Sequence, residues 1–115
     1  MYKEIKIGDS VYPIKFGINA VRLFCDKFKI SLADLNTALN SENLTLTQAL
    51  YLCFCGLKDG HRKAKKPFNF VIDDIADLMD EDEALVEKIM EVFIEQMSSK
   101  SKKKTQTQKK VKNLT

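Results

Sequence analysis

The chain has 115 residues, of which 44% are hydrophobic and 30% are charged. This length predicts one domain built around one core. No apolar run approaches the roughly 20 residues that span a bilayer, and the first residues lack the hydrophobic stretch of a signal peptide. We therefore expect a cytoplasmic protein in which the three cysteines, Cys25, Cys53 and Cys55, are free thiols.

Charge is divided unevenly along the chain. Residues 98–115 contain seven lysines and no acid, whereas residues 1–97 contain 12 basic and 16 acidic side chains. The basic segment has almost no apolar content, so it cannot offset the entropy of ordering and is predicted to be disordered. Its lysines could bind nucleic-acid phosphates, but no aromatic residue lies among them to stack on bases. A nucleic-acid arm and incidental charge both stay open.

The first residues alternate in polarity as β-strands do. Ile5 and Ile7 share one face, the turn sequence GDS follows, and the run YPIKF alternates again. This pattern predicts a β-hairpin over residues 2–16. Pro13 has no N–H to donate to a ladder, so the second strand is expected to be an edge or to carry a bulge.

After Gly17 the hydrophobic period changes from two to about 3.6, which is typical of amphipathic helices. The apolar residues predict one helix over about 19–28 and a short second helix over about 31–39. The hydroxyl of Ser31 is suited to cap the second helix.

The third predicted helix has a sharper beginning and end. Thr45 and Gln48 form the sequence of a capping box, which opens a helix over 46–64. Pro67 prevents the helix from continuing. From Ala49 to Leu57 the residues are apolar all round, which indicates a central core helix covered by its neighbours on every side.

Two further helices are predicted in the acidic part of the chain. A short helix over about 73–79 has acids at its positive end, and a final helix over about 81–97 is opened by a second cap signature, Asp80 with Glu83. The predicted fold is therefore α+β and mainly α. A hairpin packs on a bundle of about four to five helices in a single domain, residues 1–97.

Two cysteines and the only histidine lie close together, in the stretch CFCGLKDGH. On a helix Cys53 and Cys55 point about 200° apart, so they cannot both ligate one ion. Free cysteine also behaves as a small hydrophobe, which favours packing over metal binding. Because polarity returns after Leu57, His61 is expected to be a solvated surface residue and Gly60 to fray or bend the helix end.

Residues typical of catalysis or cofactor binding are scarce. One histidine, expected to be exposed, forms no triad or Cys–His pair, and the four glycines form no phosphate-binding loop. Asp73, Asp74 and Asp77 could attract a cation, but they open a helix, where acids are expected anyway. We expect no enzyme activity, no cofactor and no metal.

Acidic residues recur every fourth position near the end of the predicted domain. They are Glu83, Glu87, Glu91 and Glu95. A row of like charges slightly destabilises a helix. The row is either a solvated outer face or a strip on which a basic partner docks, and the second reading makes these four residues the candidate partner-binding site.

The order of motifs also resembles that of a known family. A hairpin IKIGDSVYPIKFGINAVRLFC is followed by LTLTQALYLCFCGLKDGHRKA, FNFVIDDIADLMDED and EKIMEVFIEQM. Over about residues 1–97 this order is similar to the tail assembly chaperones of long-tailed bacteriophages and prophages.

The resemblance implies a non-enzymatic function in the cytoplasm of a bacterial host. Members of the family bind the long, helical tape measure protein, keep it soluble, and bring tail tube subunits to it. The alternative from another class is a small nucleic-acid-binding or regulatory protein that uses its basic segment.

Overall fold

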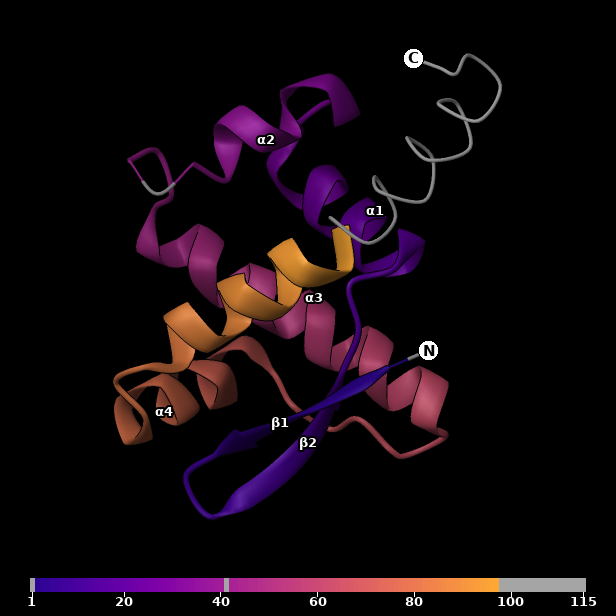
Figure 1. The fold of residues 1–115 in the computed structure, drawn as a ribbon, viewed down its shortest axis with the longest axis vertical. Helices are drawn as coiled ribbons and strands as arrows, with labels where there is room; N and C mark the ends of the chain where they lie inside the picture. The colour runs from indigo at the N-terminus through magenta and orange to yellow at the C-terminus, as the bar shows by residue number, and fades with distance from the viewer. Residues whose placement is uncertain (1, 41, 98–115) are drawn as a thin grey trace, which may run out of the picture.

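The computed structural model describes residues 2–40 and 42–97 of the chain. An N-terminal hairpin and five α-helices make up this part, so the α+β, mainly α prediction is confirmed (Figure 1). The segment 98–115, predicted to be disordered, lies outside the described residues.

The hairpin forms where the alternation predicts it. Strands β1 (Lys3–Ile7) and β2 (Ser10–Ile14) are antiparallel. Gly8, with φ of 61°, is the first of two turn residues, as in a type II′ turn. Pro13 lies opposite Glu4. Since both strands of a two-stranded sheet are edges, the ladder tolerates a residue without an N–H.

The helices follow the predicted order. Their bounds are Ile18–Phe28 for α1, Leu35–Ala38 for α2, Leu46–Ala64 for α3 and Ile72–Glu81 for α4, with a last helix over residues 85–97. The predicted helix 31–39 is split, because a 3-10 turn (Leu32–Asp34) capped by the Ser31 side chain precedes α2. The capping box of α3 is present, with Thr45 and Gln48 bonded reciprocally.

The predicted start of the last helix is wrong. Asp80 and Glu81 continue α4, and the chain becomes extended at Asp82. Asp82 forms the turn that leads into the last helix: its carboxylate accepts from the N–H of Ala84 at 3.0 Å, and its carbonyl accepts from the N–H of Leu85. Its side chain also accepts from Lys88, which lowers the pKa of Asp82.

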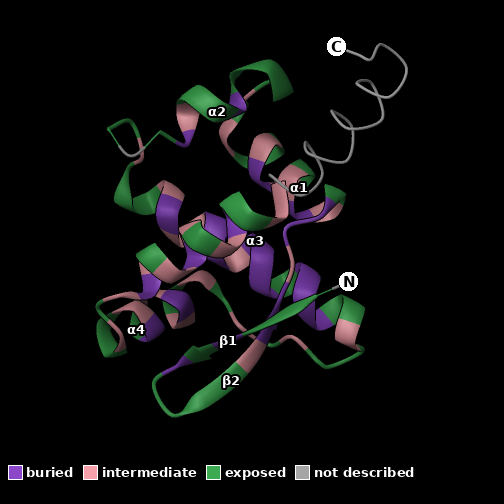
Figure 2. Cartoon of the chain, viewed as in Figure 1, coloured by how far each residue is buried: buried purple, intermediate pink, exposed green. Residues whose placement is uncertain are grey.

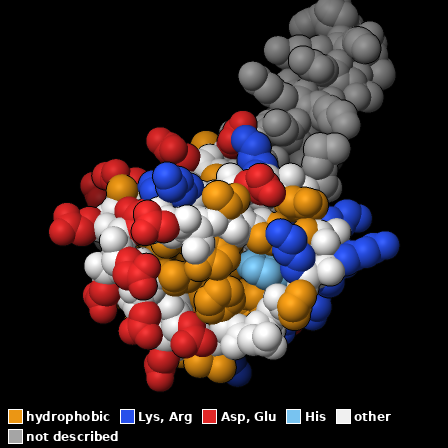
Figure 3. Space-filling model, turned by 90° about the horizontal axis from the view of Figure 1, so that it is seen from below, with side chains coloured by type: hydrophobic (Ala, Val, Ile, Leu, Met, Phe, Trp, Pro, Cys, Tyr) orange, Lys and Arg blue, Asp and Glu red, His pale blue; other side chains and the backbone are white. Residues whose placement is uncertain are grey.

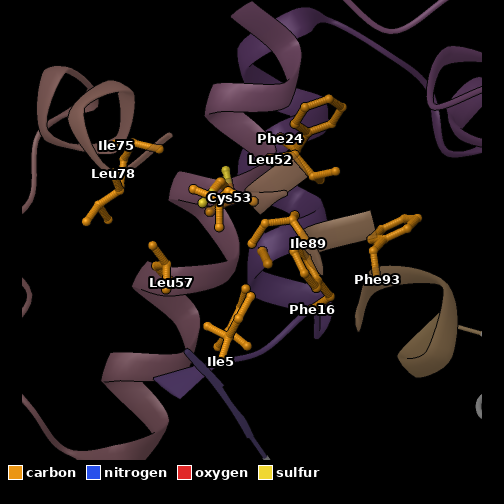
Figure 4. Close-up of a cluster of buried hydrophobic side chains, with 14 of the residues drawn as sticks. Ile5, Phe16, Phe24, Leu52, Cys53, Leu57, Ile75, Leu78, Ile89 and Phe93 are labelled. Atoms are coloured by element: carbon orange, nitrogen blue, oxygen red, sulfur yellow. The ribbon is translucent and has the colours of Figure 1, made fainter. Parts of the chain in front are cut away.

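Helix α3 is the centre of the molecule, as predicted. No residue from Ala49 to Leu57 is exposed, and strand β2 and helices α1 and α4 pack against α3 (Figure 2). The core side chains come from every layer: Ile5 and Phe16 from the hairpin region, Phe24 from α1, Leu52, Cys53 and Leu57 from α3, Ile75 and Leu78 from α4, and Ile89 and Phe93 from the last helix (Figure 4).

Two glycines allow β2 to lie directly on α3. A methyl group at Gly60 would lie 2.4 Å from the backbone nitrogen of Ile14, and one at Gly56 would lie 2.5 Å from the Phe16 ring. The N–H of Lys15 also donates to the carbonyl of Gly56 at 2.9 Å. The expectation that Gly60 frays the helix is therefore wrong, because Gly60 is buried inside α3 at its closest approach to the strand.

The last helix is tied to the hairpin by polar contacts as well as by its apolar face. Gln96 accepts from the backbone N–H of Phe16 at 2.6 Å, and Lys88 donates to the carbonyl of Lys6 at 3.0 Å. Its apolar face, which includes Ile89 and Phe93, lies in the core. This fixed helix forms one wall of the groove described below.

Candidate partner-binding groove

An open apolar groove of about 670 Å³ lies between the start of α3 and the last helix. Figure 1 shows this helix, in orange, crossing α3. The groove is lined by Leu44, Thr45, Leu46 and Ala49 on one wall and by Val86, Glu87, Met90, Glu91 and Ile94 on the other. Leu46 is 68% exposed and Ile94 is 56% exposed, so each wall carries a large apolar side chain in contact with solvent.

Helical geometry explains the composition of the second wall. Successive residues on an α-helix are about 100° apart, so Val86, Met90 and Ile94 form a continuous stripe. Glu87 and Glu91 each follow one residue after the stripe, about 100° further from Val86 and Met90. The side facing the core is taken by Leu85, Ile89 and Phe93. The acids therefore edge the groove on its outer side.

The structure separates the four acids that the sequence grouped together. Glu87 and Glu91 line the groove. Glu83 lies in the turn before the helix, and Glu95 pairs with Lys3 of β1 at 2.5 Å. A spacing of four residues advances about 40° around a helix at each step, which carries Glu95 away from the groove.

The cysteines of α3 are packed within the core. Burial is the main reason why the pKa values of Cys53 and Cys55 are both raised to about 12. Burial and the neighbouring Asp26 also raise the pKa of Cys25. A thiolate is the reactive form of cysteine, so these shifts oppose nucleophilic chemistry near neutral pH.

The prediction of a solvated His61 is wrong. This side chain is only 6% exposed, and its Nδ1 lies 2.7 Å from the carbonyl oxygen of Leu57. The centroid of its ring lies 5.1 Å from that of Phe68, 6.0 Å from that of Phe70 and 6.3 Å from that of Tyr12. The segment after α3 folds back with Phe68 and Phe70 and covers the imidazole, a long-range effect that local polarity could not indicate.

Asp59 is a buried acid whose role sequence reasoning missed. It is 2% exposed, and its carboxylate accepts from Arg62 at 2.7 Å and from the backbone N–H of Gly17 at 3.3 Å. The Lys15 ammonium lies 3.8 Å away. The only local signal was Arg62 three residues later, a spacing that places two side chains on the same helix face.

Among the aspartates of α4, Asp74 helps to begin that helix. Asp74 accepts from the backbone N–H of Val71 at 2.8 Å. Asp74 and Asp77 also border a depression with Pro67, Asn69 and Phe70. Across residues 2–40 and 42–97, no group of three or more His, Cys, Asp or Glu residues is placed to hold a metal ion.

Charge is segregated on the face that contains the histidine. Most of the visible acidic side chains gather on one side, most of the visible Lys and Arg side chains lie on the opposite side, and a group of apolar side chains lies beside the histidine between them (Figure 3). Within the described part of the chain, no helix is long and apolar enough to cross a bilayer.

Comparisons with protein-family models, with curated protein sequences and with solved structures give no match. The groove and the resemblance in motif order are therefore the two features that point to a function.

Proposed function

We propose that this protein is a tail assembly chaperone of a long-tailed phage or prophage, acting in the bacterial cytoplasm without catalysis. In this role it binds the tape measure protein and helps to recruit tail tube subunits. The observation that carries the proposal is the groove between α3 and the last helix. An open apolar groove with acidic side chains on one edge is suited to hold an amphipathic helix, and the tape measure protein is a long helical client.

A single groove of this size supports modest affinity. Many copies arrayed along one long client would add their contacts through multivalency, so weak individual binding is compatible with stable coating. The packing of Cys53 and Cys55 in the core supports a binding role over a nucleophilic one.

Co-expression tests this proposal. The full chain, expressed with the tape measure protein of the same phage or prophage, is expected to copurify with that client and to raise its soluble fraction. Co-expression with an unrelated long helical protein is the control. No copurification and no gain in soluble client would contradict the proposal.

The second candidate, a small nucleic-acid-binding or regulatory protein, depends on the seven lysines of residues 98–115. Retention of DNA and RNA by the full chain and by a chain ending at residue 98, measured at two salt concentrations, separates the two functions. Salt-sensitive retention that disappears with the lysines favours the second candidate, because counterion release makes phosphate binding salt-dependent.

A further inference from the structure

We infer that the groove between α3 and the last helix binds one short amphipathic helix with Lys or Arg along a single flank, held in one direction. The inference deepens the proposed function, since it names the segment of the client that would bind. It concerns a contact surface, so a synthetic peptide can test it without the tape measure protein.

The apolar stripe sets the length of the bound helix. Val86 and Ile94 are eight residues apart, which is about 12 Å along the helix axis. A partner helix lying along the stripe therefore needs two to three turns, with apolar residues at spacings of three and four on one face. Leu46 and Ile94 are the exposed anchors on the two walls, and the flexible Met90 between them can adapt to different side chains.

The charges of the groove are one-sided. Glu87 and Glu91, both on the last helix, are the only charged residues of the lining. On the opposite wall Thr45 is neutral, and both its hydroxyl and its backbone N–H are bonded to Gln48 in the capping box. Basic residues of a partner would thus be attracted to one wall only.

One-sided charge specifies direction. A helix whose apolar face enters the groove can lie in either of two antiparallel directions. Turning it end for end moves its basic flank from the last helix to the α3 wall, where no carboxylate lines the groove. Electrostatic complementarity of this kind discriminates between orientations of a bound segment.

The Lys-rich segment of the chain itself does not have this chemistry. Residues 98–115 contain only two apolar residues, Val111 and Leu114, so they cannot supply an apolar face two to three turns long. They can compete with a partner for Glu87 and Glu91 only through charge.

The first experiment measures binding of fluorescent helical peptides to the full chain by anisotropy at low and moderate salt. The peptides share one apolar face and carry either Lys or Glu along one flank. We expect the Lys peptide to bind more tightly, with an advantage that shrinks as salt rises. The double variant Glu87→Lys/Glu91→Lys is expected to lose about tenfold in affinity for the Lys peptide and to prefer the Glu peptide.

Matched controls separate the groove from general surface charge and apolarity. Glu83→Lys changes an acid outside the groove, and Ile18→Ser changes an exposed apolar residue on α1. Neither should alter peptide affinity by more than about twofold, whereas Ile94→Ser and Leu46→Ser should each weaken it by about fivefold or more. All four side chains are exposed, and circular dichroism verifies that the variants fold.

The second experiment tests direction with a photo-crosslinker at the N-terminus of the peptide. The crosslink should form near one end of the stripe, at Val86 or at Ile94. The site of the crosslink should move to the other end when the Lys residues are transferred to the opposite flank of the peptide. Crosslinking at both ends for both peptides would overturn the directional inference. Equal effects of Glu83→Lys and of the groove variants would overturn the site.

The inference and the proposed function can fail separately. If the peptides bind as described but the tape measure protein does not copurify, the groove stands and the chaperone function is wrong. If the client copurifies equally well with the Glu87→Lys/Glu91→Lys and Ile94→Ser variants, the function stands and the groove is not its site. Filling of the groove by a second copy, seen as competition between self-association and peptide binding, would also overturn the inference.

Discussion

At the scale of single residues, Asp59 joins α3 to the beginning of α1. Its buried carboxylate accepts from Arg62 and from the N–H of Gly17, the residue before α1, and lies near Lys15. A buried acid is costly unless it is paired and hydrogen-bonded, and here three groups share that role. The contact is structural, and none of its residues lines the groove.

Asp59→Ala is expected to destabilise the fold by about 2–3 kcal/mol, because it leaves a buried N–H and a largely buried ammonium without their acceptor. Chemical denaturation measures the loss. Asp26→Ala is the control: Asp26 pairs with Arg22 on the surface, and such pairs contribute about 0–1 kcal/mol. Equal losses for the two variants would contradict the role given to Asp59.

The buried thiols predict a pH dependence. Cys53 and Cys55 have a pKa raised by burial from 9.0 to about 12, so between these values they ionise in the unfolded state but not in the folded state. The contribution of the two thiols to the free energy of unfolding is fully present below pH 9. It is lost as pH rises toward 12, by up to about 1.4 kcal/mol per pH unit for each thiol.

Denaturation of the wild type and of Cys53→Ala/Cys55→Ala at pH 8 and pH 10.5 measures this contribution. The double variant lacks both groups, so its stability should fall less steeply with pH, whatever the absolute cost of the substitutions. Parallel pH profiles for the two proteins would show that these thiols ionise alike in the folded and unfolded states.

Lysines occupy the left-handed position after two helices. Lys29 ends α1 with φ of 54° and Lys65 ends α3 with φ of 61°. The α3 end has the two backbone bonds of a Schellman motif, from Lys66 to His61 and from Lys65 to Arg62, whereas at the α1 end Lys29 and Ile30 both donate to the carbonyl of Cys25. Glycine adopts this conformation without steric cost. Lys65→Gly should therefore stabilise the fold by about 0.5–1 kcal/mol, whereas Lys63→Gly, inside α3, should destabilise it by about the same amount. Thermal unfolding of both variants compares them, and a loss of stability in Lys65→Gly would contradict the explanation.

At the scale of elements, the contact between α3 and β2 depends on two glycines spaced by four residues. Gly60 faces the backbone of Ile14, and Gly56 faces the ring of Phe16. A backbone cannot move aside as a ring can. The two positions should therefore differ in their tolerance of a methyl group, although both lie in the same helix.

Gly60→Ala is expected to cost more than 2 kcal/mol, even though alanine favours the helix by about 1 kcal/mol. Gly56→Ala should cost less than Gly60→Ala, because the Phe16 side chain can shift slightly. Urea unfolding of both variants gives the comparison. A neutral or stabilising Gly60→Ala would mean that β2 does not lie as close to α3 as described.

The elements that the sequence predicts well are those whose signals are local. The hairpin follows from alternation around a Gly-containing turn, and α3 follows from its capping box and its continuous apolar run. The last helix was predicted to begin too early because Asp80 with Glu83 has the local sequence of a capping box. In the structure α4 continues through Glu81, and Asp82, which has no Glu or Gln three residues later, forms the turn before the last helix.

The site residues were less predictable, since tertiary packing determines them. His61 is buried by aromatic side chains that lie beyond Pro67, and Asp59 is paired with residues from the β2–α1 junction. The spacing of four residues grouped Glu83, Glu87, Glu91 and Glu95, but only contact with α3 distinguishes the two that line the groove. The opposite wall, with Leu44 and Leu46, comes from a distant part of the chain, so the sequence of the last helix does not indicate it.

At the scale of the whole molecule, one core holds the last helix in place beside α3, so that the two walls of the groove keep a fixed position. The last helix is fixed by its apolar face and by its bonds to the hairpin, through Gln96 and Lys88. It therefore presents Glu87, Glu91 and Ile94 on a rigid element beside α3. Rigid presentation lowers the entropic cost of binding a partner.

Copurification of the tape measure protein with the wild-type chain and with the Glu87→Lys/Glu91→Lys/Ile94→Ser variant shows whether the groove holds this client. We expect the wild type to retain the client and the folded variant to release most of it at the same salt concentration. Equal retention by both proteins, or retention by neither, would mean that the groove does not bind this client.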